Sequence, residues 1–450
     1  MSGGDAARSA SILQTVRRWP GHAVRFFTIG AVAAIALGIY GVLRLASLLI
    51  RDRERRAARV AHVRGRVLRA SMSTLGATFI KLGQVMSSRP DLFAPEMIAE
   101  LRKLQDRLPP FAFRHVTRIL REDLGKIDEH FQSVEPVPVA AASVAQVHRG
   151  RLLDGTVVAI KVLRPNVRRK AERDGGILLA LARVMELHPK MRLSEPVAHL
   201  RHFVDGIVGQ TDLRAEAANY RAFTSNFAAM SDVRFPRTFP DHSSERVLTM
   251  EFLDGKKLDA LDPGPHPALA AVTRKVFFKM CFEDGLVHAD LHPGNMLLLT
   301  DGRLGVFDVG LVKQMSDDVL VQLIDFSKCV AMGTVPDFVA HLRRFHHYMD
   351  DVDWVAVERD ATDFIGRFRG MTSGQLEMGK FINEVFTIAR RHRIRPVPET
   401  TLVLVGVVTS EGIAKMLDPS VDTFREMATY LMPILARRGL GLAATPPAAS

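Results

Sequence analysis

Two short polar segments near residue 300 carry the side chains best suited to chemistry. Residues 287–295 read VHADLHPGN, and residues 307–310 read FDVG. Asn295 and Asp308 offer the hard oxygen atoms that Mg²⁺ prefers as ligands, and Asp290 offers a carboxylate that could align an attacking group. Because the first segment would also suit a plain polar turn before a strand, the chemical interpretation depends on the rest of the chain.

An earlier lysine completes a set of phosphate-binding groups. Residues 158–161 read VAIK, which is the strand whose lysine contacts the nucleotide phosphates in protein kinases. The spacings of the two polar segments are those of the kinase catalytic and metal-binding loops. Lys161 then needs a carboxylate to orient it, and Glu216 in a helical stretch is the candidate. The predicted catalytic and metal-binding side chains are Asp290, Lys161, Glu216, Asn295 and Asp308.

The remaining contacts to ATP are expected from two further segments. Residues 248–255 read LTMEFLDG, which is typical of the last small-lobe strand and the hinge that meets adenine through its backbone. The Gly-rich loop is absent, and residues 139–146 (VAAASVAQ) take its place. Side chains there limit how closely backbone amides approach phosphates, so nucleotide preference should differ from that of ordinary kinases. The predicted ATP-binding residues are Ala140, Ala141, Ala142, Ser143, Val144, Lys161, Met250, Glu251 and Phe252.

Two missing features argue against a peptide substrate. His288 is followed by Ala289 instead of the arginine that senses phosphorylation of the activation loop. No Ala-Pro-Glu follows Asp308, and helix-like sequence resumes near residue 317. The platform that holds a peptide in protein kinases is therefore not expected.

The elements that must position these residues indicate an α+β fold rather than alternating β–α–β units. Apolar residues at helical spacing predict helices at 95–108 and 113–125. Two strands, 143–148 and 156–163, are expected to flank an Asp-Gly turn. Further along the chain we expect helices at 176–188 and 196–229, a strand at 246–252, and mostly helix from 267 to about 435.

This order predicts a protein-kinase-like two-lobe fold with an N-terminal helical extension and an N-terminal membrane helix. The expected parts are a basic segment (1–25), a transmembrane or membrane-anchoring helix (26–50), a basic segment with a helical extension (51–125), a small lobe (126–255), and a large helical lobe with a disordered tail (256–450).

Composition supports a globular protein whose positive charge is local. Hydrophobic residues make up 47% and charged residues 24% of the 450 residues, so a sizeable core is expected. Residues 1–70 contain thirteen arginines and three acids, which accounts for ten of the net +12 charges. The main domain therefore has no basic face, and nucleic acid is not an expected partner. The two cysteines, Cys281 and Cys329, are expected in the core of a protein from a reducing compartment.

An apolar run lies inside the basic N-terminal block. Residues 26–43 contain no charged side chain, and 18 residues are the lower limit for crossing a bilayer. More arginines follow the run than precede it, which favours a cytoplasmic location for the rest of the chain at the cell membrane. A buried helix, an interfacial helix, a cleaved signal and an organellar transit sequence leading to an inner membrane stay as alternatives.

As a set, these motifs resemble the UbiB family of atypical kinase-like proteins over residues 70–420, most of the chain. The family-specific segment is KLGQ at 81–84, and the alanine-rich loop, VAIK, EAAN at 216–219, HADLHPGN and FDVG follow in family order. The resemblance implies a regulatory extension, with Lys81, Gly83 and Gln84, that folds across the active site. One departure is Gln210, which stands where the family usually has a glutamate that could pair with Lys81, and Asp212 could serve instead.

The resemblance implies an ATP- (or ADP-) and Mg²⁺-dependent enzyme that hydrolyses ATP or phosphorylates a small or lipid-like molecule. Its expected setting is the membrane, in support of ubiquinone or other isoprenoid-lipid metabolism. The expected partners are membrane lipids, isoprenoid or quinone precursors, and quinone-pathway enzymes. A nucleotide-binding pseudokinase scaffold is the alternative, followed by a conventional Ser/Thr kinase and by membrane remodelling through the N-terminal helix alone.

Overall fold

The computed structural model describes most of the chain and forms two compact units. The described residues are 19–87, 95–104, 109–188, 196–262, 264–289, 291–346, 348, 351–368, 371, 372, 374–394, 412, 413 and 415–439. The first unit comprises Met1–Ala215 and Phe239–Thr249, and the second comprises Glu216–Thr238 and Met250–Ser450. Asp290 and the expected disordered tail after residue 439 lie outside the described residues.

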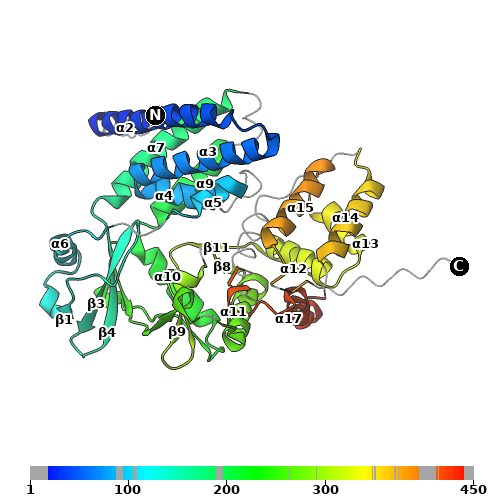
Figure 1. Ribbon diagram of the computed structural model, residues 1–450. Helices are drawn as coiled ribbons and strands as arrows, with labels where there is room; N and C mark the ends of the chain where they lie inside the picture. Colours follow the sequence, from blue (N-terminus) through cyan, green and yellow to red (C-terminus); the bar gives the residue numbers. More distant parts are fainter. Residues whose placement is uncertain are drawn as a thin grey trace, which may run out of the picture. The chain divides into compact units, whose positions relative to one another are not determined.

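A five-stranded sheet forms the β part of the first unit (Figure 1), with the order β1-β3-β4-β6 and β2 paired to β3. The predicted Asp-Gly turn joins β3 to β4, and Gly155 there has a φ of 88°, which favours glycine. The two expected strands are confirmed, although the first begins two residues later than expected. The strands are β1 (Phe131–Val134), β2 (Ala140–Ala141), β3 (Ala145–Leu152), β4 (Val157–Leu163) and β6 (Val247–Glu251).

Helix α6 (Phe113–Leu124) covers one face of this sheet. Val116, Ile119 and Leu120 recur at helical spacing, and all three are buried against apolar residues of β1, β3, β4 and β6. The helix is capped by Gly125, whose φ of 90° is unfavourable for residues that have a side chain. The helix predicted at 113–125 is therefore confirmed.

A group of helices completes the first unit. Its core contains Met72, Phe79, Leu101 and Leu178, and the partly buried Ile29 packs against them. The helices are α2 (Trp19–Ser47), α3 (Arg53–Leu75), α4 (Ala77–Ser87), α5 (Pro95–Leu101), α7 (Val167–Glu186) and α9 (Pro196–Gly209).

The second unit contains two small sheets within a mainly helical structure (Figure 1). The expectation of mostly helix from residue 267 is wrong between 286 and 314, where apolar stretches around the Asp301-Gly302 turn pair as strands instead. The four-stranded sheet has the order β5 (Val233–Arg234), β10 (Leu304–Val306), β9 (Met296–Leu299) and β7 (Gly255–Lys257), and the two-stranded sheet pairs β8 (Leu286–His288) with β11 (Val312–Gln314).

The helices of the second unit enclose an aromatic core that includes Phe338, Phe364 and Phe381. The helix expected to resume near residue 317 is confirmed as α12, which Ser316 caps by accepting the N–H of Val319. The helices are α10 (Leu213–Asn226, from Glu216 onward), α11 (Pro267–Lys279), α12 (Asp317–Ala331), α13 (Val335–Phe345), α14 (Trp354–Phe368), α15 (Met378–Arg391) and α17 (Thr423–Arg438).

The helical stretch predicted at 196–229 is two helices. Helix α9 ends at Gly209, and α10 begins at Leu213. Asp212 interrupts the run because its side chain accepts the N–H of Arg214 at 3.0 Å, which satisfies a donor at the start of the second helix.

Candidate nucleotide and metal site

The two predicted metal ligands lie at the same end of one strand pair. Strands β9 and β10 are antiparallel with Met296 opposite Val306, so Asn295 and Phe307 flank the last pair. The N–H of Phe307 donates to the carbonyl of Asn295 at 3.0 Å. This pairing brings Asn295 and Asp308, thirteen positions apart in the sequence, to one end of the hairpin. Both offer hard oxygen atoms, so the donor set fits Mg²⁺.

Helix α10 fixes the loop that carries Asp308. The backbone N–H of Asp308 donates to the hydroxyl of Tyr220 at 2.8 Å, and the Asn219 amide donates to the carbonyl of Val309 at 2.9 Å. Asp308 itself has a φ of 58°, a left-handed conformation that is uncommon outside glycine. Such a backbone persists where its surroundings over-determine it, and the fully buried Tyr220 supplies that constraint.

Glu216 lies beside the same loop. Its carboxylate is buried, with an exposed fraction of 5%. A Cβ built on Gly310 would lie 3.4 Å from Oε2 of Glu216 and 3.5 Å from Oδ1 of Asp308. The structure therefore brings Glu216, Asp308 and Asn295 together within the second unit. The predicted pairing of Glu216 with Lys161, which belongs to the first unit, stays a prediction.

The backbone just before residue 290 is hydrogen-bonded to the segment that follows the Asp308 loop. The N–H of Ala289 donates to the carbonyl of Leu311 at 2.9 Å. His292 begins the short 3-10 turn Pro293–Asn295, because its Nδ1 accepts the N–H of Gly294 at 3.1 Å. These bonds fix the backbone on both sides of residue 290, whose own placement lies outside the described residues.

Lys161 lies on the central part of β4, directly opposite Val147 of β3. Its neighbours Ile160 and Val162 are fully buried in the core under α6. Because side chains alternate along a strand, Lys161 points to the opposite face of the sheet. Its exposed fraction is only 7%, so Lys161 is buried and is not a solvated residue at a strand edge. Its contact with the nucleotide phosphates stays a prediction.

The alanine-rich loop is a tight hairpin turn held by one arginine. The N–H of Ala142 donates to the carbonyl of Ala145 at 2.8 Å, which closes the turn between β2 and β3. Arg164 follows β4 and donates twice to the turn, from its Nε to the carbonyl of Ala142 and from its backbone N–H to that of Val144, each at 2.8 Å. Burial lowers the pKa of Arg164. No sequence motif marks Arg164 as a residue that holds this loop.

The buried side chains of Gln146 and His148 add further hydrogen bonds next to the alanine-rich turn. The Gln146 side chain accepts the N–H of Phe111 at 3.0 Å and lies 2.8 Å from Nε2 of His148. Nδ1 of His148 lies 2.7 Å from the carbonyl of Glu135. A carbonyl only accepts, so Nδ1 carries the proton and Nε2 accepts from Gln146. Burial lowers the pKa of His148, which keeps the imidazole neutral.

The predicted hinge residues close the end of β6. Met250 is buried and bridges to Thr238. The carboxylate of Glu251 pairs with Arg234 of β5, and its N–H donates to the carbonyl of Arg237 at 2.8 Å. Because Arg234 occupies its side chain, Glu251 would contact adenine only through the backbone. The contacts of Met250, Glu251 and Phe252 with a nucleotide stay predictions.

The KLGQ segment lies on α4, and two of its residues have a packing role. A Cβ added to Gly83 would lie 2.2 Å from Cδ1 of Leu104 and 2.6 Å from Sδ of Met72, so a larger residue would force these buried side chains to shift. The Gln84 amide donates to the carbonyl of Leu104 at 3.3 Å. Lys81 is half-buried, and its proposed regulatory role stays a prediction.

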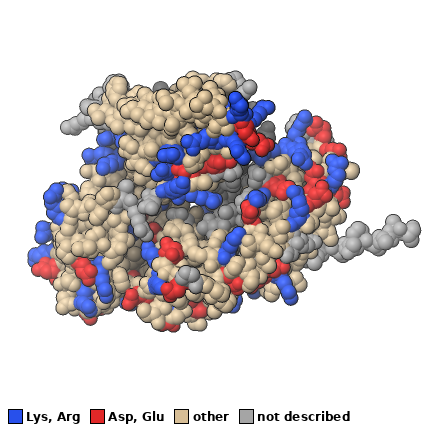
Figure 2. Space-filling view, viewed as in Figure 1, with Lys and Arg blue, Asp and Glu red and all other residues tan. Residues whose placement is uncertain are grey.

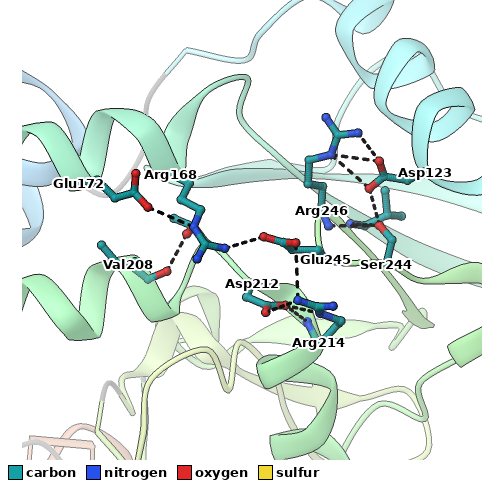
Figure 3. A network of polar contacts seen from close by, with 11 residues as sticks. Asp123, Arg168, Glu172, Val208, Asp212, Arg214, Ser244, Glu245 and Arg246 are labelled. Carbon is teal, nitrogen blue, oxygen red and sulfur yellow. Dashed lines mark hydrogen bonds and ion pairs between the residues drawn. The ribbon is translucent and has the colours of Figure 1, made fainter. Parts of the chain in front are cut away.

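Asp212, two residues after Gln210, belongs to a charged network (Figure 3). Asp212 accepts two hydrogen bonds from the Arg214 guanidinium, at 2.9 and 2.8 Å, which hold the pKa of its carboxyl below the usual range. Glu245 lies between Arg214 and Arg168, with distances of 3.5 and 2.6 Å. A pairing of Asp212 with Lys81 would have to compete with this arginine fork.

Other polar clusters do not add a second metal site. Within the described ranges, no group of three or more His, Cys, Asp or Glu side chains is placed to hold a metal ion. A cavity of about 510 Å³ lies between α14 and α15. Most of the charges that line it are paired, Asp360 with Arg391 and His392, and Arg367 with Glu384.

The strand lysine, the paired metal-ligand loops and the helical second unit define a kinase-like protein. The search of solved structures supports that fold. The complex structure of Rv3197–erythromycin from Mycobacterium tuberculosis matches with a TM-score of 0.53 and 22% identity, covering 79% of this chain and 92% of the other.

Comparison of sequences gives the family. A model of the ABC1 atypical kinase-like domain matches residues 103–333, and a model of the UbiB helical domain matches residues 361–422. "Probable protein kinase UbiB" of Pseudomonas paraeruginosa is 31% identical over 386 residues, 82% of this chain and 71% of the relative. "Uncharacterized protein sll1770" of Synechocystis is 30% identical over 376 residues, and the match spans 64% of that relative's length. The chain belongs to the UbiB family of ABC1 atypical kinase-like proteins, which confirms the resemblance seen in the sequence.

Proposed function

We propose that this chain is a Mg²⁺-dependent atypical kinase or ATPase, attached to a membrane, that supports ubiquinone or other isoprenoid-lipid metabolism. The observation that carries the proposal is the joint placement of Asn295 and Asp308 at one end of β9–β10, with Asp308 fixed by Tyr220. The ubiquinone link is supported by the relative named UbiB. Lipid, isoprenoid or quinone precursors and quinone-pathway enzymes are the proposed partners.

In this proposal the chain's own residues bind and orient the nucleotide. Asn295 and Asp308 hold the metal, which when bound neutralises charge on the phosphates. Asn219 and Tyr220 hold the backbone of residues 308 and 309 in place, which limits the reorganisation needed around Asp308 during the reaction. Lys161 is assigned to the phosphates, and Asp290 to alignment of the attacking hydroxyl group or water.

The proposal allows two acceptors for the transferred phosphoryl group, and the expected lack of a peptide platform makes a protein substrate the less favoured third. With water as acceptor the enzyme is an ATPase, and with a hydroxyl group of a small or lipid-like molecule it is a kinase. Turnover of ATP in the presence of vesicles, with and without polyprenyl alcohols, distinguishes the two by whether phosphate is released or appears on the lipid.

The test of the enzymatic part compares wild type with Asp308→Asn. Steady-state hydrolysis of ATP by the purified chain should fall strongly in the variant, and cells carrying the variant should show an altered isoprenoid-lipid profile. Equal turnover in the two proteins would reject an ATP-dependent enzyme.

A pseudokinase scaffold is the second candidate, and the alanine-rich loop motivates it. Arg164 pins the turn at Ala142 by side-chain and backbone bonds, which limits its movement over a nucleotide. Thermal stabilisation by MgATP without any hydrolysis, in wild type as well as in Asp308→Asn, would favour this function over the enzyme.

A further inference from the structure

The outer surface of α2 is apolar and exposed. The stretch Ala23–Ser47 is 25 residues long, and its most apolar 18-residue window has a mean hydropathy of 2.2 and is only 6% buried. In the space-filling view, the edge formed by α2 is almost free of charged residues, and Lys and Arg lie beneath it over α3 (Figure 2). Apolar side chains that are exposed there include Val24, Phe27, Ile35, Leu37, Val42 and Leu45.

The opposite stripe of α2 is used to pack against α3. The two helices are antiparallel, since Arg25 donates to the carbonyl of Leu75 at 2.6 Å, and Tyr40, fifteen residues later, contacts Arg64. Ile29 joins the core of the helical group. We refer to α2, α3 and the turn between them as the α2–α3 hairpin.

A buried ion pair fastens this hairpin to the rest of the first unit. Arg25 donates to both carboxylate oxygens of Asp174 on α7, at 2.7 and 2.9 Å. The Asp174 side chain is only 5% exposed, and the guanidinium also lies over the ring of Phe79 on α4, 5.7 Å from its centroid. Pulling α2 away would leave Asp174 buried without this partner, which is strongly unfavourable.

Helix α3 is rich in arginine near the turn. Asp52 begins the helix by accepting the N–H of Arg55 at 2.9 Å. The helix has a single acid in its first turn, Glu54. Arginines that are exposed on the turn and on α3 are Arg51, Arg53, Arg55, Arg59, Arg64 and Arg66.

This geometry opposes a membrane-spanning position for α2. If α2 crossed the bilayer as part of the hairpin, α3 would carry its arginines into the hydrocarbon, where each charge is costly. If α2 crossed alone, the packing with α3 and the Arg25–Asp174 pair would be lost. Neither cost arises when the hairpin lies flat, because arginines then stay at the level of the lipid phosphates.

We propose that the α2–α3 hairpin lies in the plane of an anionic membrane surface, with the outer face of α2 in the acyl region and the arginines against the phosphates. The proposal rests on the membrane attachment in the proposed function and specifies its geometry. A second copy of this chain fits the surface less well, since two copies would bring like-charged α3 helices together. An anionic bilayer complements both the apolar face and the positive charge.

Depth measurements on α2 test the orientation. Val24, Ile35 and Val42 share one face at helical spacing, with exposed fractions of 68%, 64% and 67%. Each is changed to cysteine in the full chain and labelled with an environment-sensitive dye. The native Cys281 and Cys329 are buried, and burial raises the pKa of both thiols, so they should stay unlabelled. Quenching by lipids that carry spin labels at defined depths then reports where each dye lies.

In vesicles with about one third anionic lipid, the in-plane orientation gives the same shallow depth at all three positions, although the outer two are about 27 Å apart along the helix. A dye at position 35 near the bilayer centre, with shallow dyes at 24 and 42, would show a spanning helix and overturn the proposal. Dyes that are shielded without vesicles by a concentration-dependent dimer would also overturn it.

Charge variants test the choice of an anionic surface. Arg51→Gln, Arg53→Gln and Arg55→Gln together should weaken vesicle binding about a hundredfold at low salt. The matched control replaces three exposed arginines of α6, Arg114, Arg118 and Arg121, with glutamine and should change binding less than about threefold. Equal weakening by both triples would contradict a specific role of the hairpin.

Hydrolysis of ATP is measured on the same preparations, which separates the two proposals. No vesicle binding with hydrolysis retained would defeat the membrane attachment and this inference while leaving the enzyme intact. In-plane binding without hydrolysis would support this inference and defeat the enzymatic part of the proposed function.

Discussion

The two units use their distinctive segments in different ways. In the second unit, HADLHPGN and FDVG place oxygen donors at one end of β9–β10, and neighbouring side chains serve to fix them. In the first unit, several distinctive residues are explained by packing: Gly83 permits a close helix contact, and Gln146 ties the alanine-rich loop to Phe111. A distinctive motif therefore does not reveal by itself whether its residues act in chemistry or hold the fold, and the surroundings decide between the two.

The largest expected effect is a loss of ATP turnover in a variant of the second unit that stays folded. Asp308→Asn should lower ATP turnover at least about a hundredfold, because an amide replaces a charged metal ligand. Asparagine tolerates the left-handed backbone at this position, so the thermal unfolding midpoint should change little. Steady-state hydrolysis and thermal unfolding are the measurements.

Asp301→Asn is the matched control for this variant. Asp301 lies in the turn of the same hairpin and pairs with Arg303 at the surface. Its loss should leave turnover within about twofold. A comparable loss of activity in both variants would mean that the hairpin as a whole, and not the Asp308 carboxylate, limits turnover.

The next largest effect is expected for a variant of the first unit, and it should be a loss of stability with little change in turnover. Gly83→Ala should lower the free energy of unfolding by about 2–3 kcal/mol, since its Cβ would overlap Leu104 and Met72. Turnover per folded molecule should change much less. Denaturant unfolding together with active-site titration separates the two quantities.

Gly176→Ala is the comparison for Gly83→Ala. Gly176 lies inside α7 with nothing within 4 Å of a built Cβ, so alanine should stabilise the helix by up to about 1 kcal/mol. If Gly83→Ala instead abolished turnover in a fully folded protein, Gly83 would belong with the chemical residues rather than with the packing residues.

A pH series tests the ionic contacts of Asp325 on α12. The hydrogen bonds that hold the backbone at Asp308 are made by uncharged groups, so they offer no such test. Burial alone would raise the pKa of Asp325, but a hydrogen bond from His341 and the ion pair with Lys328 outweigh it and hold the pKa at about 2. Both partners lie 2.9 Å from the carboxylate. A lowered carboxyl pKa contributes stability above the unfolded-state pKa of about 3.9, and this contribution is lost as the pH falls toward 2.

The measurement is the free energy of unfolding of wild type and Asp325→Asn between pH 6 and 2. The difference of about 2 kcal/mol at pH 6 should shrink toward zero at the acid end. Asp363→Asn, an exposed position on α14, should show a small difference throughout. A difference that stays constant over this range would show that Asp325 acts by packing and not by its charge.

The smallest effect should come from the residue that positions the metal loop. Tyr220→Phe removes the hydroxyl that accepts the N–H of Asp308, leaving a buried donor without this bond. We expect kcat/KM for MgATP to fall about tenfold, with a cost in stability of about 1–2 kcal/mol. A dependence of KM on Mg²⁺ concentration should accompany this loss, since the ligand is less well placed.

Tyr430→Phe provides the control for this last variant. Its hydroxyl donates to Glu283 at 2.6 Å, away from the metal loop, so only a modest change in stability is expected. Unchanged kinetics in Tyr220→Phe would mean that the backbone pairing of β9–β10 positions Asp308 without help from α10.

Much of the fold followed from local patterns. The helix at 113–125, the β3–β4 hairpin and the strand before the hinge depend on spacing and turn residues, which act over a few positions. The candidate metal ligands were also predicted, because their types and spacing are distinctive. The break between α9 and α10 was missed, since Asp212 stops one helix and starts the next through a single side-chain bond.

The residues that hold the site could not be predicted from spacing. Tyr220 lies 88 positions from Asp308, and Arg164 lies 22 positions from Ala142, and no local pattern marks such contacts. Asn219 belongs to the EAAN segment through which Glu216 was found, and Tyr220 directly follows that segment, but the motif does not indicate which residues they contact.

The sequence by itself determined the chemical groups: the lysine, the oxygen donors, the apolar helix and the arginines around it. Residue type and local spacing suffice for these, because they depend on covalent identity and short-range geometry. Only the tertiary structure decided how the groups are paired. It fixed Asp308 against Tyr220 and placed the apolar α2 alongside the basic α3. In both cases the contacting residues are far apart in the sequence, so no local pattern reveals the contact.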